Sequence, residues 1–223
     1  MELVEAIKSR KSIRGYMSIP VPKEILTQIL EISTLSPSAM NIQPWQFTIM
    51  GGTLLDEMKK ALEEKYLAGE EMQLDFGQFA TRLTGVYRER QVTLAKDIFE
   101  LMNIDREDKG KRMEWTLKML RFFDAPNGII ISTDEEVSDF MCVYSLGLIT
   151  QTITLVALEY GLGTCIEQDP VMYPKVIRQF TGIPESQKIA MAIAIGYPDW
   201  SFPANKLQSN REPLSNIVTW LGV

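Results

Sequence analysis

Two short apolar runs, separated by one long apolar stretch, constrain the fold of this chain more than any other feature. Residues 127–133 and 189–195 are rich in isoleucine and contain no charged side chain. Runs of this length and apolarity are typical of strands buried on both faces. Residues 137–160 lie between them, are mostly apolar over a helical length, and are followed by Gly161 and Gly163. The chain therefore predicts buried strands together with one long apolar helix.

Helices outnumber strands in the rest of the chain, and no linker or internal repeat divides it. Further elements are predicted as helices through residues 3–7, 25–32, 54–68 and 171–181 and as a strand at 46–50. Residues 69–123 are charged and helical in pattern, which indicates a helical excursion. The tail after residue 198 is punctuated by prolines, and we expect it to pack on something else, such as another subunit. One α+β domain covering residues 1–223 accounts for this pattern.

Composition excludes several classes of function. With 23 basic and 29 acidic residues the net charge is −6, which disfavours nucleic acid as a partner. The chain has no histidine, so Ser-His-Asp and Cys-His catalysis is impossible, and no metal site is expected. Cys142 and Cys165 fit neither a zinc site nor a redox pair, which suggests reduced thiols. The charged N-terminus and the polar interruptions of apolar stretches disfavour secretion and membrane spanning, so we expect a cytoplasmic protein.

A basic cluster stands out in this acidic chain. Arg10, Lys11, Ser12 and Arg14 bring two guanidinium groups, an ammonium and a hydroxyl together within five residues. These are donors that suit a phosphate. The same cations would also complement the negative end of the first predicted helix, and the residues alone leave both interpretations open.

Two further segments have a functional and a purely structural interpretation. Residues 36–45 form a loop of neutral donors and acceptors, which suits recognition of a heterocycle or simply ends a helix before a strand. Residues 161–168 contain two glycines, which either let backbone approach a ligand or cap the preceding helix. Arg211, with Lys206 nearby, stands in the tail; a lone arginine there is usually a solvated surface residue.

The order of these pieces resembles the FMN-dependent nitroreductase family. The segments that carry the resemblance are Arg10 to Arg14, Ser36 to Trp45, Gly161 to Cys165, Ile195 to Pro198 and Arg211 to Leu214. The resemblance covers residues 2–51 and 125–220. The resemblance does not extend to residues 69–123, and in this family that region varies with substrate.

The resemblance implies a homodimer with a central, mainly antiparallel sheet surrounded by helices and a C-terminal tail exchanged between subunits. Two FMN sites would lie at the interface. The implied ligands of the FMN phosphate and ring edge are Arg10, Lys11, Ser12, Arg14 and Arg211. The implied contacts from the other subunit are Pro37, Ser38 and Asn41, with Ser36. The implied neighbours of the flavin N5 and O4 edge are Cys165, Ile166, Glu167 and Gln168. Because Glu212 replaces a second cation beside Arg211, Lys206 is a candidate assistant at the phosphate.

The resemblance also implies an activity that needs no histidine, because the flavin performs the chemistry. NADH or NADPH would give a hydride to bound FMN, and an electron-poor acceptor such as a nitroaromatic or a quinone would take the electrons. The candidates for an aromatic wall over the acceptor are Tyr66, Phe76, Phe79 and Trp115. Alternatives are an FMN-binding sensor or storage module without turnover, a reductive dehalogenase, an enal reductase, or flavin destruction for cobalamin ligand synthesis.

Overall fold

A four-stranded antiparallel sheet forms the centre of the protein. The computed structural model describes residues 1–76, 83–138 and 140–223. The strands are β1 (Gln46–Gly51), β2 (Asn127–Asp134), β3 (Gly163–Glu167) and β4 (Gln187–Gly196), in the spatial order β1-β2-β4-β3. Every neighbouring pair is antiparallel. The predicted strands at 46–50, 127–133 and 189–195 are confirmed, as is the mainly antiparallel sheet.

The central strands β2 and β4 are apolar on both faces because each face covers a different core. Ile130 of β2 packs against the side that carries helices α3, α5 and α7, whereas Ile129 and Ile131 pack against α2 and α6. All three side chains are completely buried. Alternate residues of a strand point to opposite faces, so a strand between two helical layers has no exposed face for polar residues.

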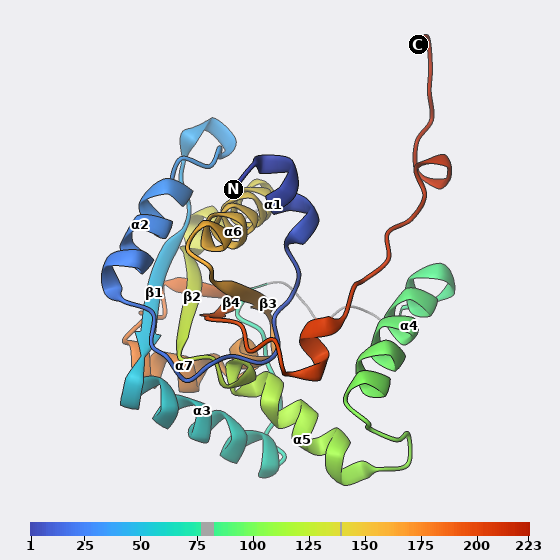
Figure 1. Ribbon diagram of the computed structural model, residues 1–223. Coiled ribbons are helices and arrows are strands. Elements are labelled where there is room, and N and C mark those ends of the chain that lie inside the picture. Colours follow the sequence, from blue (N-terminus) through green and yellow to red (C-terminus); the bar gives the residue numbers. More distant parts are fainter. Residues whose placement is uncertain (77–82, 139) are drawn as a thin grey trace.

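The helices form a layer on each side of the sheet (Figure 1). One layer consists of α1 (Leu3–Ser9), α2 (Lys23–Ser33) and α6 (Phe140–Glu159). The other consists of α3 (Gly52–Leu67), α5 (Lys109–Leu120) and α7 (Pro174–Thr181), and α4 (Gly85–Leu101) stands at the side of the molecule. The two opening helices are confirmed. Of the predicted helical excursion at residues 69–123, the described part contains α4 and α5, residues 69–76 are not helical, and residues 77–82 lie outside the described residues.

Helix α6 is buried on one side only. Leu146, Ile149 and Ile153 pack in the core, whereas Phe140 and Tyr144 are exposed. By length and composition alone α6 is apolar enough to cross a membrane, a test that the core helix of a globular protein also passes. Here its buried side packs against the sheet and α2, so we interpret it as a core helix with one uncovered apolar face.

Two sequence-based expectations need correction. The glycine segment at residues 161–168 was expected to approach a ligand or to cap the preceding helix, and no strand was predicted there, but residues 163–167 form the edge strand β3. Gly161 does end α6 with φ +69°, so the capping interpretation holds for that glycine. The tail was expected to pack elsewhere from residue 198 on. Instead Ala204 and Leu207 are buried in this chain's own core, and only residues 208–223 project from the molecule (Figure 1).

Candidate functional site

The basic cluster is positioned by its attachment to the edge strand β3. The Ile13 amide donates to the Thr164 carbonyl at 2.9 Å, and Ser12 forms a parallel bridge with Thr164. A Cβ atom at Gly163 would lie only 2.4 Å from the Ile13 side chain and 2.8 Å from Pro198. A glycine is therefore required at position 163 for the segment around Ile13 to approach β3 this closely.

Asn205 locks the same segment to the base of the tail. Its Oδ1 accepts from the Arg14 amide at 2.7 Å, and its Nδ2 donates to the Gly15 carbonyl at 2.7 Å and the Asp199 carbonyl at 2.8 Å. The side chain is fully buried, so these bonds satisfy polar groups that water does not reach. The sequence offers no signal for this residue, because an isolated asparagine in a proline-rich tail predicts only a turn.

The cations of the cluster are half-buried and lack acidic partners. None of the ion pairs among the described residues involves Arg10, Lys11 or Arg14. The Arg14 guanidinium lies 5.9 Å from the Phe123 ring centre and donates weakly to the Ser12 carbonyl at 3.4 Å. Lys11 differs, because its Nζ donates to the Asn205 carbonyl at 2.8 Å and so also holds the tail. Uncompensated guanidinium groups beside a hydroxyl fit an anionic ligand such as a phosphate.

Four ionisable side chains lie buried or half-buried next to this cluster. Cys165 and Glu167 follow each other on one face of β3, and Tyr16 and Asp169 lie nearby. Burial raises the pKa of Glu167 well above its usual range, with Asp169 adding repulsion. Burial likewise raises the pKa of Asp169, raises that of Tyr16 well above its usual range, and raises that of Cys165 to about 12. In all four groups burial therefore shifts the equilibrium toward the protonated form.

The loop at residues 36–43 is held on α6. The Ser36 hydroxyl donates to Thr152 Oγ1 at 2.7 Å, and the Ser38 hydroxyl accepts from the Gln43 amide at 3.0 Å. Met40, Asn41 and Gln43 have φ of 49°, 58° and 46°, which costs energy for residues other than glycine and is common at functional sites.

The contacts of this loop are with α6, whereas those of the basic cluster are with β3 and the tail base. Pro37 and Asn41 are both exposed, and Ser38 is half-buried. The residues predicted to act from a second subunit therefore project from a different part of the molecule.

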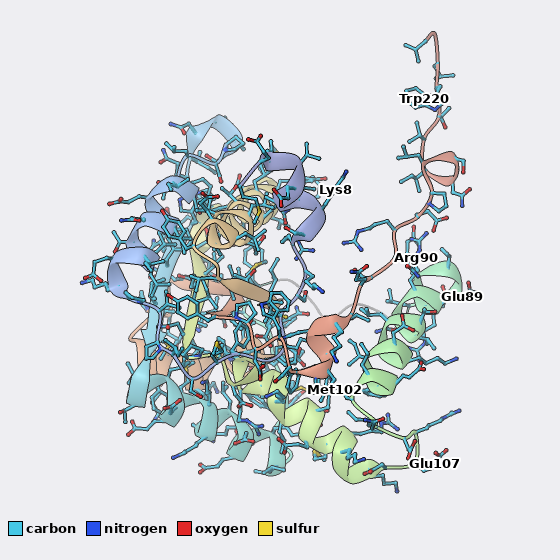
Figure 2. All side chains as sticks on the ribbon, in the orientation of Figure 1. Lys8, Glu89, Arg90, Met102, Glu107 and Trp220 are labelled. Atoms are coloured by element: carbon cyan, nitrogen blue, oxygen red, sulfur yellow. The ribbon has the colours of Figure 1, made fainter. Side chains whose placement is uncertain are left out.

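The tail residue Arg211 is not placed at the basic cluster of its own chain. Its Nη1 donates to Ser209 and to the Asn210 carbonyl, all within the projecting segment. The neighbouring Glu212 forms an ion pair with Arg90 of α4 at 2.6 Å (Figure 2). Lys206 is exposed at the base of the tail.

An open cavity of about 650 Å³ lies between α4 and α5. Tyr66 and Trp115, two of the aromatic residues proposed to form a wall, both line it, together with Phe99. Phe76 instead packs beside the core of α2 and α6, and Phe79 lies outside the described residues.

The cations suit an anionic ligand, and the α+β fold is the one that a family of known proteins shares. The profile described as Nitroreductase family matches residues 7–197, so the chain belongs to the nitroreductase family. It is 28% identical over 218 residues to a 4-nitrobenzoate reductase of Pseudomonas putida, covering 97% of this chain and 94% of the relative. It is 28% identical over 220 residues to a chloronitrobenzene nitroreductase of Comamonas testosteroni, covering 97% and 96%.

A solved structure shares the whole fold. The crystal structure of the FMN and NADPH-dependent nitroreductase NfnB from Sphigopyxis sp. strain HMH superimposes with a TM-score of 0.95 at 26% identity, covering 100% of both chains. The likeness therefore includes the excursion at residues 69–123, for which the sequence alone indicated no relative.

Proposed function

We propose that this protein is an FMN-dependent oxidoreductase that passes two electrons from NADH or NADPH to a nitroaromatic or quinone acceptor. The observation that carries the proposal is the likeness over 100% of both chains to an FMN and NADPH-dependent nitroreductase. Relatives named for 4-nitrobenzoate and chloronitrobenzene support the same acceptor class.

The cationic cluster is the proposed FMN phosphate site. Arg10 and Arg14 supply charge-assisted donors, and Ser12 supplies a neutral donor. Lys11 has fewer donors to offer, because its Nζ already donates to the Asn205 and Leu207 carbonyls at the base of the tail. FMN, when bound, would supply the hydride chemistry, and the backbone of Cys165 to Gln168 would hold its reactive edge. The chain contributes placement and positive charge, which stabilises the anionic reduced cofactor.

We propose a homodimer in which each site is completed by the second copy, with the tail exchanged. The contacts from the other subunit are Pro37, Ser38 and Asn41, and Arg211 joins the phosphate site from the tail. Two exposed apolar surfaces support this arrangement. One is the uncovered face of α6, and the other is the projecting tail, where Trp220 is 71% and Leu221 84% exposed. Apolar surface of this kind marks interfaces.

The aromatic lining of the cavity between α4 and α5 forms the proposed wall over the acceptor. Tyr66 and Trp115 offer aromatic surface for stacking, and Arg112 at the cavity lining offers a cation to an acidic substituent. This assignment makes the excursion the part of the chain that selects the acceptor.

An anaerobic visible absorption spectrum tests the proposal. The purified protein should show a flavin spectrum that NADPH or NADH bleaches and that 4-nitrobenzoate then restores. A flavin spectrum that persists with both nucleotides would identify a binding module without turnover. A colourless protein that FMN does not reconstitute would overturn the cofactor assignment.

A further inference from the structure

The cavity between α4 and α5 joins an aromatic interior to a positively charged lining. Trp115 lines it and is only 7% exposed, and the rings of Tyr66 and Phe99 add further aromatic surface. Among the described residues that line the cavity, the charged side chains are Lys109 and Arg112, and none is acidic. A ligand that matches this lining therefore has an aromatic ring and a negative charge.

Neither cation is neutralised by an acidic side chain. The Lys109 ammonium has no hydrogen-bond or ion-pair partner in the part of the chain that the structure describes. The Arg112 guanidinium donates through Nη1 to the Arg106 carbonyl at 3.1 Å and lies 6.0 Å from the Phe99 ring centre. A guanidinium group carries several N–H donors in a planar fork, so most of those of Arg112 remain free for a ligand.

Two acidic groups adjoin these cations in the sequence but pair with other side chains. The Asp108 carboxylate accepts from the Lys111 amide at 2.9 Å and lies 3.9 Å from the Lys111 ammonium. Glu114 pairs with Arg121 at 2.6 Å. The cavity lining therefore keeps a local positive charge, although the chain as a whole carries a net charge of −6.

The size of the cavity leaves selection to charge rather than to shape. Its volume of about 650 Å³ lies in the usual range for small-molecule sites. A closed cavity of roughly 150 Å³ is enough to hold benzene, so an acceptor with a single ring leaves most of this open cavity unfilled. Stacking on Trp115 does not distinguish a neutral substituent from an acidic one, whereas a bond to a cation does.

The cavity adjoins the proposed cofactor site through one aromatic ring. The ring centres of Trp115 and Phe123 are 5.6 Å apart, and the Arg14 guanidinium lies 5.9 Å from the centre of the same Phe123 ring. Phe123 is only 3% exposed. An aromatic ligand that stacks on Trp115 is thus separated from the basic cluster by a single buried side chain.

We propose that this cavity selects aromatic acceptors that carry a carboxylate or another anionic substituent, which Arg112 and Lys109 bind while the ring stacks on Trp115. This inference rests on the proposed function, because it names the acceptor class of the same site. Arg112 forms the charge-assisted hydrogen bonds, since its planar guanidinium group matches a carboxylate, and Lys109 adds a second positive charge. A neutral acceptor of the same shape stacks equally well but leaves both cations without a partner.

Binding is measured without turnover, by titrating 4-nitrobenzoate or 4-nitrobenzamide into the purified protein in a calorimeter in the absence of NADPH. The two compounds differ in charge but little in shape. The wild type should bind the benzoate about 10-fold more tightly, and Arg112→Gln should abolish most of this preference. Equal affinities for the two compounds in the wild type would overturn the proposal.

Lys111→Gln is the matched control for this titration. It removes the same charge from α5, at a side chain that does not line the cavity and is 55% exposed. The preference for the benzoate should survive in this variant. If Lys111→Gln and Arg112→Gln lost the preference equally, the net charge of the protein rather than the cavity would set it, and the proposal would be wrong.

The location of the bound acceptor is tested by filling the cavity. Ala95 lines it from α4 and is exposed, so a larger side chain at this position does not disturb the core. Ala95→Trp should weaken the binding of both compounds, because the added indole occupies the space that the aromatic ring needs. Unchanged affinity for both would place the acceptor outside the cavity and contradict the inference.

Turnover separates this inference from the proposed function. The ratio of kcat/KM for 4-nitrobenzoate over 4-nitrobenzamide should fall about 10-fold in Arg112→Gln and further in Arg112→Glu, which repels the carboxylate. Each ratio comes from one protein preparation, so partial unfolding of a variant does not alter it. If NADPH bleaches the flavin but the ratio is the same in all three proteins, the inference fails while the proposed function stands. A wild type that binds no flavin, or whose flavin is not bleached, overturns the proposed function, whereas the titrations still decide the preference of the cavity.

Discussion

The basic cluster at residues 10–14 and the tail at residues 208–223 are expected to bind the same phosphate, but they differ in how they are anchored to the rest of this chain. The cluster is bonded to β3 through Thr164 and to the tail base through Asn205. In the tail, Arg211 bonds only its neighbours, and Glu212 alone links the segment to α4. The first set of cations is preorganised by its own chain, whereas the second is not.

This difference indicates that a single chain provides only part of the proposed binding site. A preorganised donor set binds a ligand without a large ordering cost, while an unanchored tail loses conformational freedom when it is fixed. A second copy that holds the tail removes that cost. We therefore expect cofactor binding and dimer formation to depend on each other.

Deletion of the tail should have the largest effect on the difference between the two regions. Deletion of residues 208–223 should give a monomer that retains its circular dichroism spectrum but binds FMN weakly. Loss of the Arg211 contact alone is worth about 1.5 to 3 kcal/mol, or roughly 10- to 100-fold in Kd. Light scattering measures the oligomeric state, and titration of flavin fluorescence measures the affinity. The full-length variant Arg211→Gln separates the lost cation from the lost dimer, and a truncated protein that remains dimeric would contradict the exchange.

Removing the anchor of the cluster should cost stability rather than assembly. Asn205→Ala leaves the Arg14 amide without its partner and removes one hydrogen bond each from the Gly15 and Asp199 carbonyl oxygens, which still accept from backbone amides. We expect the free energy of unfolding in urea to fall by about 2 to 4 kcal/mol. Asn216→Ala is the matched control, because this asparagine bonds Glu212 in the exposed tail. If both variants lost equal stability, the contrast between the two regions would be wrong.

Patterns of apolar residues were enough to predict most of the fold. The strands at 127–133 and 189–195 could be predicted because a core lies on each of their faces, and the helix at 137–160 because it is apolar over most of its length. The strand β3 could not be predicted, since Gly161 just before it and Gly163 at its start are typical of a turn or a helix cap. An edge strand of five residues takes its shape from pairing with β4 and from Ile13, which no local pattern records.

The candidate site could be predicted from the sequence only through the order of its motifs. Arg10, Arg14 and the glycine segment were found because charge and glycine stand out in an acidic helical chain. Asn205 was missed because its role depends on partners more than 180 residues away, and the dual role of Lys11 was missed for the same reason. The burial of Glu167 was equally hidden, since its environment is made by five separate segments.

The cluster itself is tested by removing one cation. Arg10→Ala should weaken FMN binding by about 1.5 to 3 kcal/mol, because a charge-assisted bond to an anion is lost, without changing the free energy of unfolding. Flavin fluorescence measures the binding and urea titration the stability. Lys8→Ala is the control, since Lys8 extends from α1 into solvent (Figure 2). Equal FMN affinity in Arg10→Ala and wild type would remove Arg10 from the phosphate site.

The weakest of the contacts compared is the ion pair between Glu212 and Arg90, which holds the tail beside α4. Its side chains are 27% and 47% exposed, so solvent and salt screen it strongly. Hydrogen bonds from Asn216 and the Arg90 pair lower the pKa of Glu212, so the contact is present above its ordinary pKa and is lost as pH falls through the lowered value. Glu212→Gln should leave the unfolding midpoint unchanged and speed amide exchange in residues 208–216 at low salt, but not at high salt. A shifted unfolding midpoint, or faster exchange that salt does not abolish, would mean that the tail is anchored by more than this pair.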